Sequence, residues 1–181
     1  MIEGDYCKFF NLYLVLLYCK KLEVGYEKNY IIAVFTVRGA FLSAPSYVDV
    51  NRIKKDGYDI DVNDSDTLAF TQKGSDMNLI VTIYFTNDGN PQNLRAAFKS
   101  IFAPQFRLKY IDEFETNRAY IQKSTRNNPD GVVYGYNIIA KKQKRKACYI
   151  NVLVVSTQEF PDELLEELAN TSLDEVESYL K

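Results

Sequence analysis

The side chains that most often do chemistry are thinly represented in this sequence. Its 181 residues include no histidine, which is the commonest general base and metal ligand near neutral pH. Nucleophile pairs that depend on histidine are therefore excluded. The three cysteines, Cys7, Cys19 and Cys148, form no CxxC pair, so neither a thiolate zinc site nor a disulfide framework is indicated. We expect no metal site, no cofactor and, for Cys148, a place inside a buried strand.

Motifs that organise a catalytic loop are also missing. The sequence has no G-x-S-x-G elbow, no phosphate-binding P-loop and no G-x-G-x-x-G dinucleotide fingerprint. An enzyme built on this chain would need Asp, Glu, Lys or Tyr with strongly shifted pKa values as its acid and base. We therefore predict a protein that is not an enzyme, with no catalytic residues to assign.

One group of polar residues resembles the start of a calcium-binding loop, with oxygen ligands at alternate positions: Asp59, Asp61, Asn63 and Asp66. The sequence departs from this pattern at the two positions where a calcium-binding loop tolerates the least change. Asp64 stands where the loop requires glycine, and Phe70 stands where it requires a bidentate glutamate. A solvated strand edge that leads into a turn accounts for the same residues.

Tyrosines and a run of cations suggest a binding surface. The chain contains 14 tyrosines, whose rings with a polar tip suit interfaces. The basic run 141–146 lies between two strand-like segments and is expected at a hairpin tip. A solvated turn and ordinary cross-strand packing are the alternatives. The predicted protein-binding surface comprises Tyr134, Tyr136, Tyr149, Lys141, Lys142, Lys144 and Arg145.

Charge is distributed asymmetrically along the chain. The formal net charge is −2, but residues 162–181 hold seven acidic side chains and one basic one. The preceding residues are mildly basic, and their charges are dispersed rather than clustered on one element. A protein is the expected partner, and nucleic acid is not.

Turn signals divide residues 45–181 into short elements of a single α+β domain. Alternating apolar residues predict an antiparallel meander of strands at 58–62, 68–72 and 77–86. Apolar residues at helical spacing predict a helix over 91–103, with Asn90 as its cap. Further strands are expected at 106–111, 118–124, 132–140 and 147–156, the last two forming a long hairpin.

Two helical pieces are expected after Pro161. Ser172 followed by Glu175 has the spacing of a capping box that would open the second piece. The apolar residues of this region are expected to face the sheet: Leu165, Leu168, Leu173, Val176 and Leu180.

Residues 1–44 form an apolar N-terminal extension with two apolar stretches, 9–19 and 30–44. Neither stretch reaches the roughly 18 consecutive apolar residues of a membrane-spanning helix. Two interpretations remain open. The segment is either a signal or anchor behind a mis-assigned start codon, or a set of additional core elements. Export to the cell envelope is slightly favoured over the cytoplasm, and membrane contact is expected only through this segment.

The order of predicted elements over residues 58–181 resembles the PsbP/Mog1-like fold group. Local similarities are the stretch Asp66-Thr67-Leu68-Ala69-Phe70 and the stretch Asn117-Arg118-Ala119-Tyr120, where Arg118 replaces the group's usual glycine. The resemblance implies an α-β-α sandwich around an antiparallel sheet. It also implies a non-catalytic domain that binds a protein partner or assists assembly, often after export, and it carries over no functional residue. A small-ligand carrier with a pocket between helix and sheet, or a histidine-free hydrolase, is the alternative.

Overall fold

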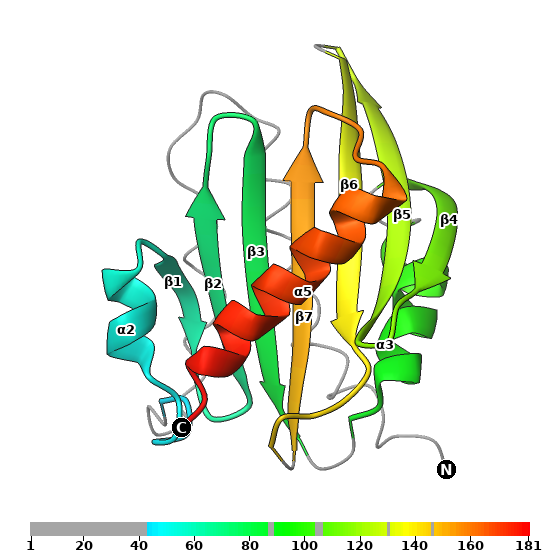
Figure 1. Cartoon of the computed structure of the whole chain (residues 1–181). Coiled ribbons are helices and arrows are strands. Elements are labelled where there is room, and N and C mark those ends of the chain that lie inside the picture. Colours follow the sequence, from blue (N-terminus) through cyan, green and yellow to red (C-terminus); the bar gives the residue numbers. More distant parts are fainter. Residues whose placement is uncertain (1–42, 87–88, 104–106, 130, 146) are drawn as a thin grey trace.

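The computed structural model describes residues 43–86, 89–103, 107–129, 131–145 and 147–181. These residues form a seven-stranded antiparallel sheet with the strand order β1-β2-β3-β7-β6-β5-β4, accompanied by helices (Figure 1). The α+β class with an antiparallel sheet is therefore confirmed. The elements are α2 Val50–Lys55, β1 Asp59–Asn63, β2 Thr67–Lys73, β3 Met77–Phe85, α3 Pro91–Ala97, the π-helical turn η1 Phe98–Phe102, β4 Lys109–Glu115, β5 Ala119–Asn128, β6 Gly131–Ala140, β7 Cys148–Ser156 and α5 Asp162–Ser178.

Two antiparallel meanders make up the sheet. β1, β2 and β3 pair in sequence order, as the alternating apolar pattern predicts, and β4, β5, β6 and β7 do the same. The pairing of β3 with β7 joins the two meanders. The predicted hairpin of β6 and β7 is confirmed, whereas β4 starts three residues later than the predicted strand 106–111.

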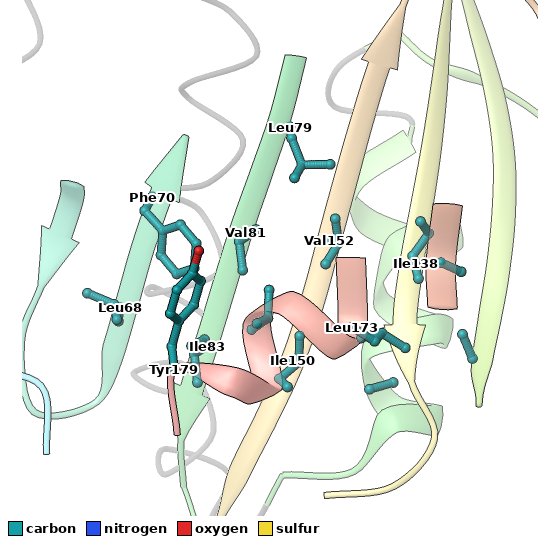
Figure 2. Close-up of a cluster of buried hydrophobic side chains, with 14 of the residues drawn as sticks. Leu68, Phe70, Leu79, Val81, Ile83, Ile138, Ile150, Val152, Leu173 and Tyr179 are labelled. Carbon is teal, nitrogen blue, oxygen red and sulfur yellow. The ribbon is translucent and has the colours of Figure 1, made fainter. Parts of the chain in front are cut away.

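α5 crosses one face of the sheet diagonally (Figure 1). Alternate residues of the strands point to this face and form the main hydrophobic core, with Phe70, Val81, Ile138, Ile150 and Val152 at its centre (Figure 2). The buried side of α5 contributes the predicted apolar residues: Leu165, Leu173 and Val176 are fully buried, and Leu168 packs against the cluster.

The prediction of two helical pieces after Pro161 is wrong, because α5 is a single helix of 17 residues. Ser172 is buried inside it and caps nothing. Buried residues continue at helical spacing across this position, so packing against the sheet overrides the capping tendency of the local sequence.

The C-terminal end of the chain is anchored between α2 and the sheet. The Tyr179 ring packs edge-on against Tyr58 and Phe70. Its hydroxyl, with a single proton to donate, lies within hydrogen-bond distance of Asp56 Oδ2 (3.1 Å) and Glu175 Oε1 (2.9 Å). α2 was not predicted, although Asp49 caps it by accepting from the Arg52 amide, and Gly57 follows it with a positive φ of 93°. These two residues mark the ends of this short helix.

α3 lies on the opposite face of the sheet. Ile121 points into the α5-side core, so its neighbour Gln122 points the other way, where its Nε2 donates to the Arg95 carbonyl (3.0 Å). The predicted N-terminus of this helix is confirmed, because Asn90 Oδ1 accepts from the Gln92 amide (2.8 Å) and Pro91 occupies the first turn. Phe98 is buried in a small separate cluster, as its place in the apolar stripe predicts.

No helix in the described ranges is long and apolar enough to cross a membrane. The two apolar stretches predicted at 9–19 and 30–44 lie outside the described residues, apart from Ser43 and Ala44. Ala44 is buried in the α5-side core, and its amide donates to Asn63 Oδ1 (2.8 Å).

Candidate functional site: a cavity at one end of the sheet

The three tyrosines of the predicted binding surface do not share a face. Tyr136 is only 1% exposed, its ring stacks on Phe160, and its hydroxyl accepts from the Phe160 amide (2.7 Å). Tyr134 lies on the same face of β6 and is partly buried against the core. Tyr149 lies on the other face, because β7 places its neighbours Cys148 and Ile150 in the α5-side core. Including Tyr136 in a partner surface is therefore wrong in this fold.

The basic run lies at the opposite end of β6 from Tyr134, about 23 Å along the strand. Its cations already contact groups of the same chain. Lys141 Nζ lies 3.0 Å from Glu115 Oε2, Lys144 Nζ lies 3.9 Å from Glu177 Oε2, and the Arg145 guanidinium lies 4.8 Å from the centre of the Tyr47 ring. Lys142 is exposed beside them. The structure thus separates the predicted surface into a cationic hairpin tip near Tyr149 and a distant Tyr134.

The residues that resemble a calcium-binding loop form hydrogen bonds at the edge of the sheet instead. Asp61 Oδ2 accepts from Thr71 Oγ1 (2.6 Å), and Asn63 Oδ1 holds the Ala44 amide. Asp64 Oδ1 accepts from the amides of Asp66 and Thr67, which closes the turn between β1 and β2. In the described parts of the chain, no three His, Cys, Asp or Glu side chains are grouped to hold a metal ion.

A row of polar side chains runs across the α3 face and was not predicted. Asn151 Nδ2 donates to Asn137 Oδ1 (2.7 Å), and Asn137 Nδ2 donates to Gln122 Oε1 (3.0 Å). Gln122 Nε2 in turn donates to Glu113 Oε2 (3.2 Å). The row joins four neighbouring strands through buried or partly buried amides, so each member depends on the next for its hydrogen bonds.

Glu113 ends this row under α3. Its carboxylate accepts from the Arg95 guanidinium and lies 2.9 Å from Lys99 Nζ. The Arg95 hydrogen bonds lower the pKa of Glu113 to about 2, so the carboxylate stays ionised at every physiological pH. This charge cluster fastens α3 to β4 and β5.

A cavity of about 190 Å³ adjoins this row at the end of the sheet where β3 begins and β7 ends. Strand register places Asn78, Val155, Gly135 and Ser124 side by side on four neighbouring strands, all on the α3 face. Gly135 has no side chain, and a Cβ there would lie 2.8 Å from Ser124 Oγ. The Ser124 hydroxyl therefore occupies the space that a side chain at position 135 would need, where it donates to the Gly135 carbonyl (3.1 Å), and both residues form part of the cavity lining.

The lining of the cavity combines apolar and polar side chains. Leu108, Val133, Leu153 and Val155 supply the apolar surface. The polar lining residues are Ser75, Asp76, Asn78, Ser124, Arg126, Asn128, Ser156 and Thr157. Such a mixture is typical of sites that hold a small organic molecule.

The chain was compared with known families and structures. No protein-family model, curated protein or solved structure matches it. Inference about its function therefore depends on the geometry of its own residues.

None of the cavity residues was predicted as a site. The one local signal was Gly135, an isolated glycine within a strand-like segment, which commonly marks a bulge or close contact. The neighbours of Gly135 come from β3, β5 and β7, and their alignment depends on register, which the local sequence does not determine.

Proposed function

We propose that this chain is a non-catalytic binding domain and that the cavity beside Gly135 is its binding site for a small ligand. The observation that carries the proposal is the cavity of about 190 Å³ on the α3 face, whose lining combines apolar side chains such as Val133 and Val155 with polar ones such as Asn78. Concave sites lined by apolar side chains together with a few polar groups are typical of small-molecule binding sites, and this cavity has such a lining.

The volume of the cavity limits the size of the ligand that it can hold. A volume of 190 Å³ corresponds to roughly six water molecules at about 30 Å³ each. A ligand of about 6–10 non-hydrogen atoms is therefore expected. Ligands of this size bind in roughly the 10 μM to 1 mM range, which suits a carrier or sensor.

Filling the cavity tests this proposal. Val133→Phe would place an aromatic ring in the hollow, whereas Val132→Phe would place the same ring on the other face of β6, where Val132 is 40% exposed. A library of small polar-aliphatic compounds is titrated into ¹⁵N-labelled protein, and amide shifts are followed by NMR. We expect hits that shift Gly135 and Val155, persist in Val132→Phe and disappear in Val133→Phe. Hits that survive Val133→Phe would place the binding site elsewhere.

A protein partner is the second candidate, and the outer side of α5 favours it. Glu163, Glu166 and Glu167 are exposed and have no ion pair within the described residues, and Leu164 beside them is 43% exposed. Charge complementarity would steer a basic partner to this surface. The resemblance to the PsbP/Mog1-like α-β-α sandwich supports the same role, that of a partner-binding or assembly-assisting domain.

A pair of matched charge reversals tests this second candidate. Glu166→Lys alters the acidic surface, and Asp59→Lys makes the same charge change on the distant strand β1, where the Asp59 side chain is 75% exposed. Affinity capture with quantitative mass spectrometry should show salt-sensitive, basic partners that are lost only with Glu166→Lys. Identical capture by both variants would contradict a role for α5.

A further inference from the structure

We propose that the α3 side of β2, β3 and β7 is a docking surface for the chain's own N-terminal extension, residues 1–42. The extension is then a set of additional core elements, one of the two interpretations that its sequence leaves open. This assignment goes beyond the proposed function, since it concerns how the part of the sheet face next to the cavity is covered.

The docking surface consists of three rows of three residues. Strand register places one residue each of β2, β3 and β7 in every row, all on the face opposite the α5-side core. Seven of the nine side chains are buried, and those of Tyr149 and Asn151 are partly buried. The rows are Thr67-Tyr84-Tyr149, Ala69-Thr82-Asn151 and Thr71-Ile80-Leu153.

The described helices do not account for this burial. α2 and α5 pack into the α5-side core, and α3 is bonded to Gln122 of β5. Within the described residues, only Val155 packs as a further apolar side chain against Ile80 and Leu153. Thr82 is nevertheless 0% exposed, and Ile80 is 2% exposed. The atoms that exclude water from this surface therefore belong to residues outside the described ranges.

Of those residues, only the N-terminal extension is long enough to cover the surface. The others are 87–88, 104–106, 130 and 146, and none of these runs exceeds three residues. The surface measures about 14 Å along β3 and about 10 Å across two strand spacings. The 11 residues of the apolar stretch 9–19 would span about 16 Å in a helix and more when extended.

The extension joins the described chain beside this surface. The Ala44 amide donates to Asn63 Oδ1 (2.8 Å) at the end of β1. Asn63 is the register partner of Leu68, and both chain neighbours of Leu68 belong to the surface. The chain thus enters the described fold next to the β2 side of the surface.

The surface and the apolar stretches also match in charge. None of the nine surface residues is charged, the stretch 9–19 has no charged residue, and the stretch 30–42 has only Arg38. The link 20–28 between the stretches holds five charged residues. Burial of the uncharged stretches is favoured by the hydrophobic effect, whereas the link stays in water because burial of unpaired charges is costly.

Thiol labelling of the full chain tests this docking. In a Cys7→Ser, Cys19→Ser background, Thr82→Cys places one thiol on the surface with little change in side-chain size. The native thiol of Cys148 reports on the α5-side core of the same sheet. We expect both thiols to be protected in native buffer. Rapid labelling of Thr82→Cys alone would show that the surface is open and would overturn the proposal.

Charges placed in the extension should expose the surface selectively. Leu14→Asp and Val34→Asp each alter one apolar stretch, and Val24→Asp makes the same change in the link as a matched control. We expect the first two to speed labelling of Thr82→Cys at least about tenfold relative to the control, with Cys148 still protected. Unchanged protection in both variants would mean that another part of the chain covers the surface, contrary to the proposal.

Photo-cross-linking gives a readout that needs no weakened variant, so it decides the case in which both thiols become exposed together. p-Benzoylphenylalanine replaces Tyr13 or Phe35 in the full chain, and Tyr26 of the link serves as the control position. We expect intramolecular cross-links from the first two positions to surface residues of β2, β3 or β7, and fewer from the third. Cross-links to α5 alone, or none to these three strands, would refute the docking.

Discussion

The two faces of the sheet are built in different ways. The face under α5 is a continuous apolar core that extends from Phe70 on β2 to Ile138 on β6 (Figure 2). The opposite face carries α3, a row of hydrogen-bonded amides, two small apolar clusters and a cavity. One sheet thus combines dense apolar packing on one side with polar side chains and empty volume on the other.

This difference indicates a division of roles. Burial of apolar area is the main source of folding free energy, and the α5 face contains most of it. Polar rows and cavities contribute less to stability and can satisfy the requirements of a ligand. We infer that the α5 face maintains the fold and that the α3 face carries the function.

Removing the aromatic anchor of the α5 face should have the largest effect. Tyr179→Ala deletes a fully buried ring that packs on Tyr58 and Phe70, so we expect a loss of about 3–5 kcal/mol in the free energy of unfolding. Tyr134→Ala, which removes a partly buried ring of the same core, should cost less. Urea unfolding followed by circular dichroism measures both. Equal losses would show that Tyr179 is not a principal anchor.

Breaking the polar row should have a smaller effect. Asn137→Leu leaves Gln122 Oε1 and an Asn151 donor without their partner, which should cost about 1–3 kcal/mol. Replacing Gln122, Asn137 and Asn151 together by Leu removes both partners of the two amide–amide bonds, although the Arg95 carbonyl and Glu113 still lose their Gln122 donor. The triple change should therefore cost less than the sum of the single changes. Strictly additive losses, measured by urea unfolding, would show that the three residues do not act as a row.

The sequence predicts those features of the two sheet faces that depend on residues close together in the chain. Local patterns predicted the Asn90 cap, the buried Phe98 and the apolar side of α5, because helical spacing reports burial directly. The alternation in β3 likewise predicted that Leu79, Val81 and Ile83 share a face.

Features that depend on strand register could not be predicted. Alternation placed Tyr134 and Tyr136 together, but the face of Tyr149 depends on the length and geometry of the turn before β7. The cavity has the same origin, since strand register alone brings its lining residues Gly135, Ser124 and Val155 together. The pairing of Lys141 with Glu115 also joins residues far apart in sequence.

Acidification should weaken the attachment of α3 by a moderate amount. Glu113 has a folded-state pKa of about 2 against an ordinary value of 4.5, so it contributes stability that is complete above about pH 4.5 and is lost as the pH falls toward 2. The contribution is on the order of 1–2 kcal/mol after solvent screening. The stability difference between the parent and Glu113→Gln, measured by urea unfolding, should therefore shrink between pH 6 and about pH 3. A constant difference would contradict this role for Glu113.

Thiol labelling probes the α5 face without altering its stability. Cys148 is fully buried, and burial raises the pKa of its thiol to about 11, so it should not react while the protein is folded. In a Cys7→Ser, Cys19→Ser background, labelling of Cys148 should occur only at urea concentrations that unfold the sheet. Rapid labelling in native buffer would show that this part of the core opens locally.

One pair of identical substitutions compares the two faces most directly. Val152 lies fully buried in the α5-side core, and Val133 lines the cavity, so Val→Phe is introduced at each position and the free energy of unfolding is measured in urea. Overpacking a filled core should make Val152→Phe lose about 1–3 kcal/mol. Filling a true hollow should leave Val133→Phe as stable as the parent or up to about 2 kcal/mol more stable. A loss at Val133 as large as that at Val152 would show that the α3 face is packed as densely as the core, and it would contradict the cavity on which the proposed function rests.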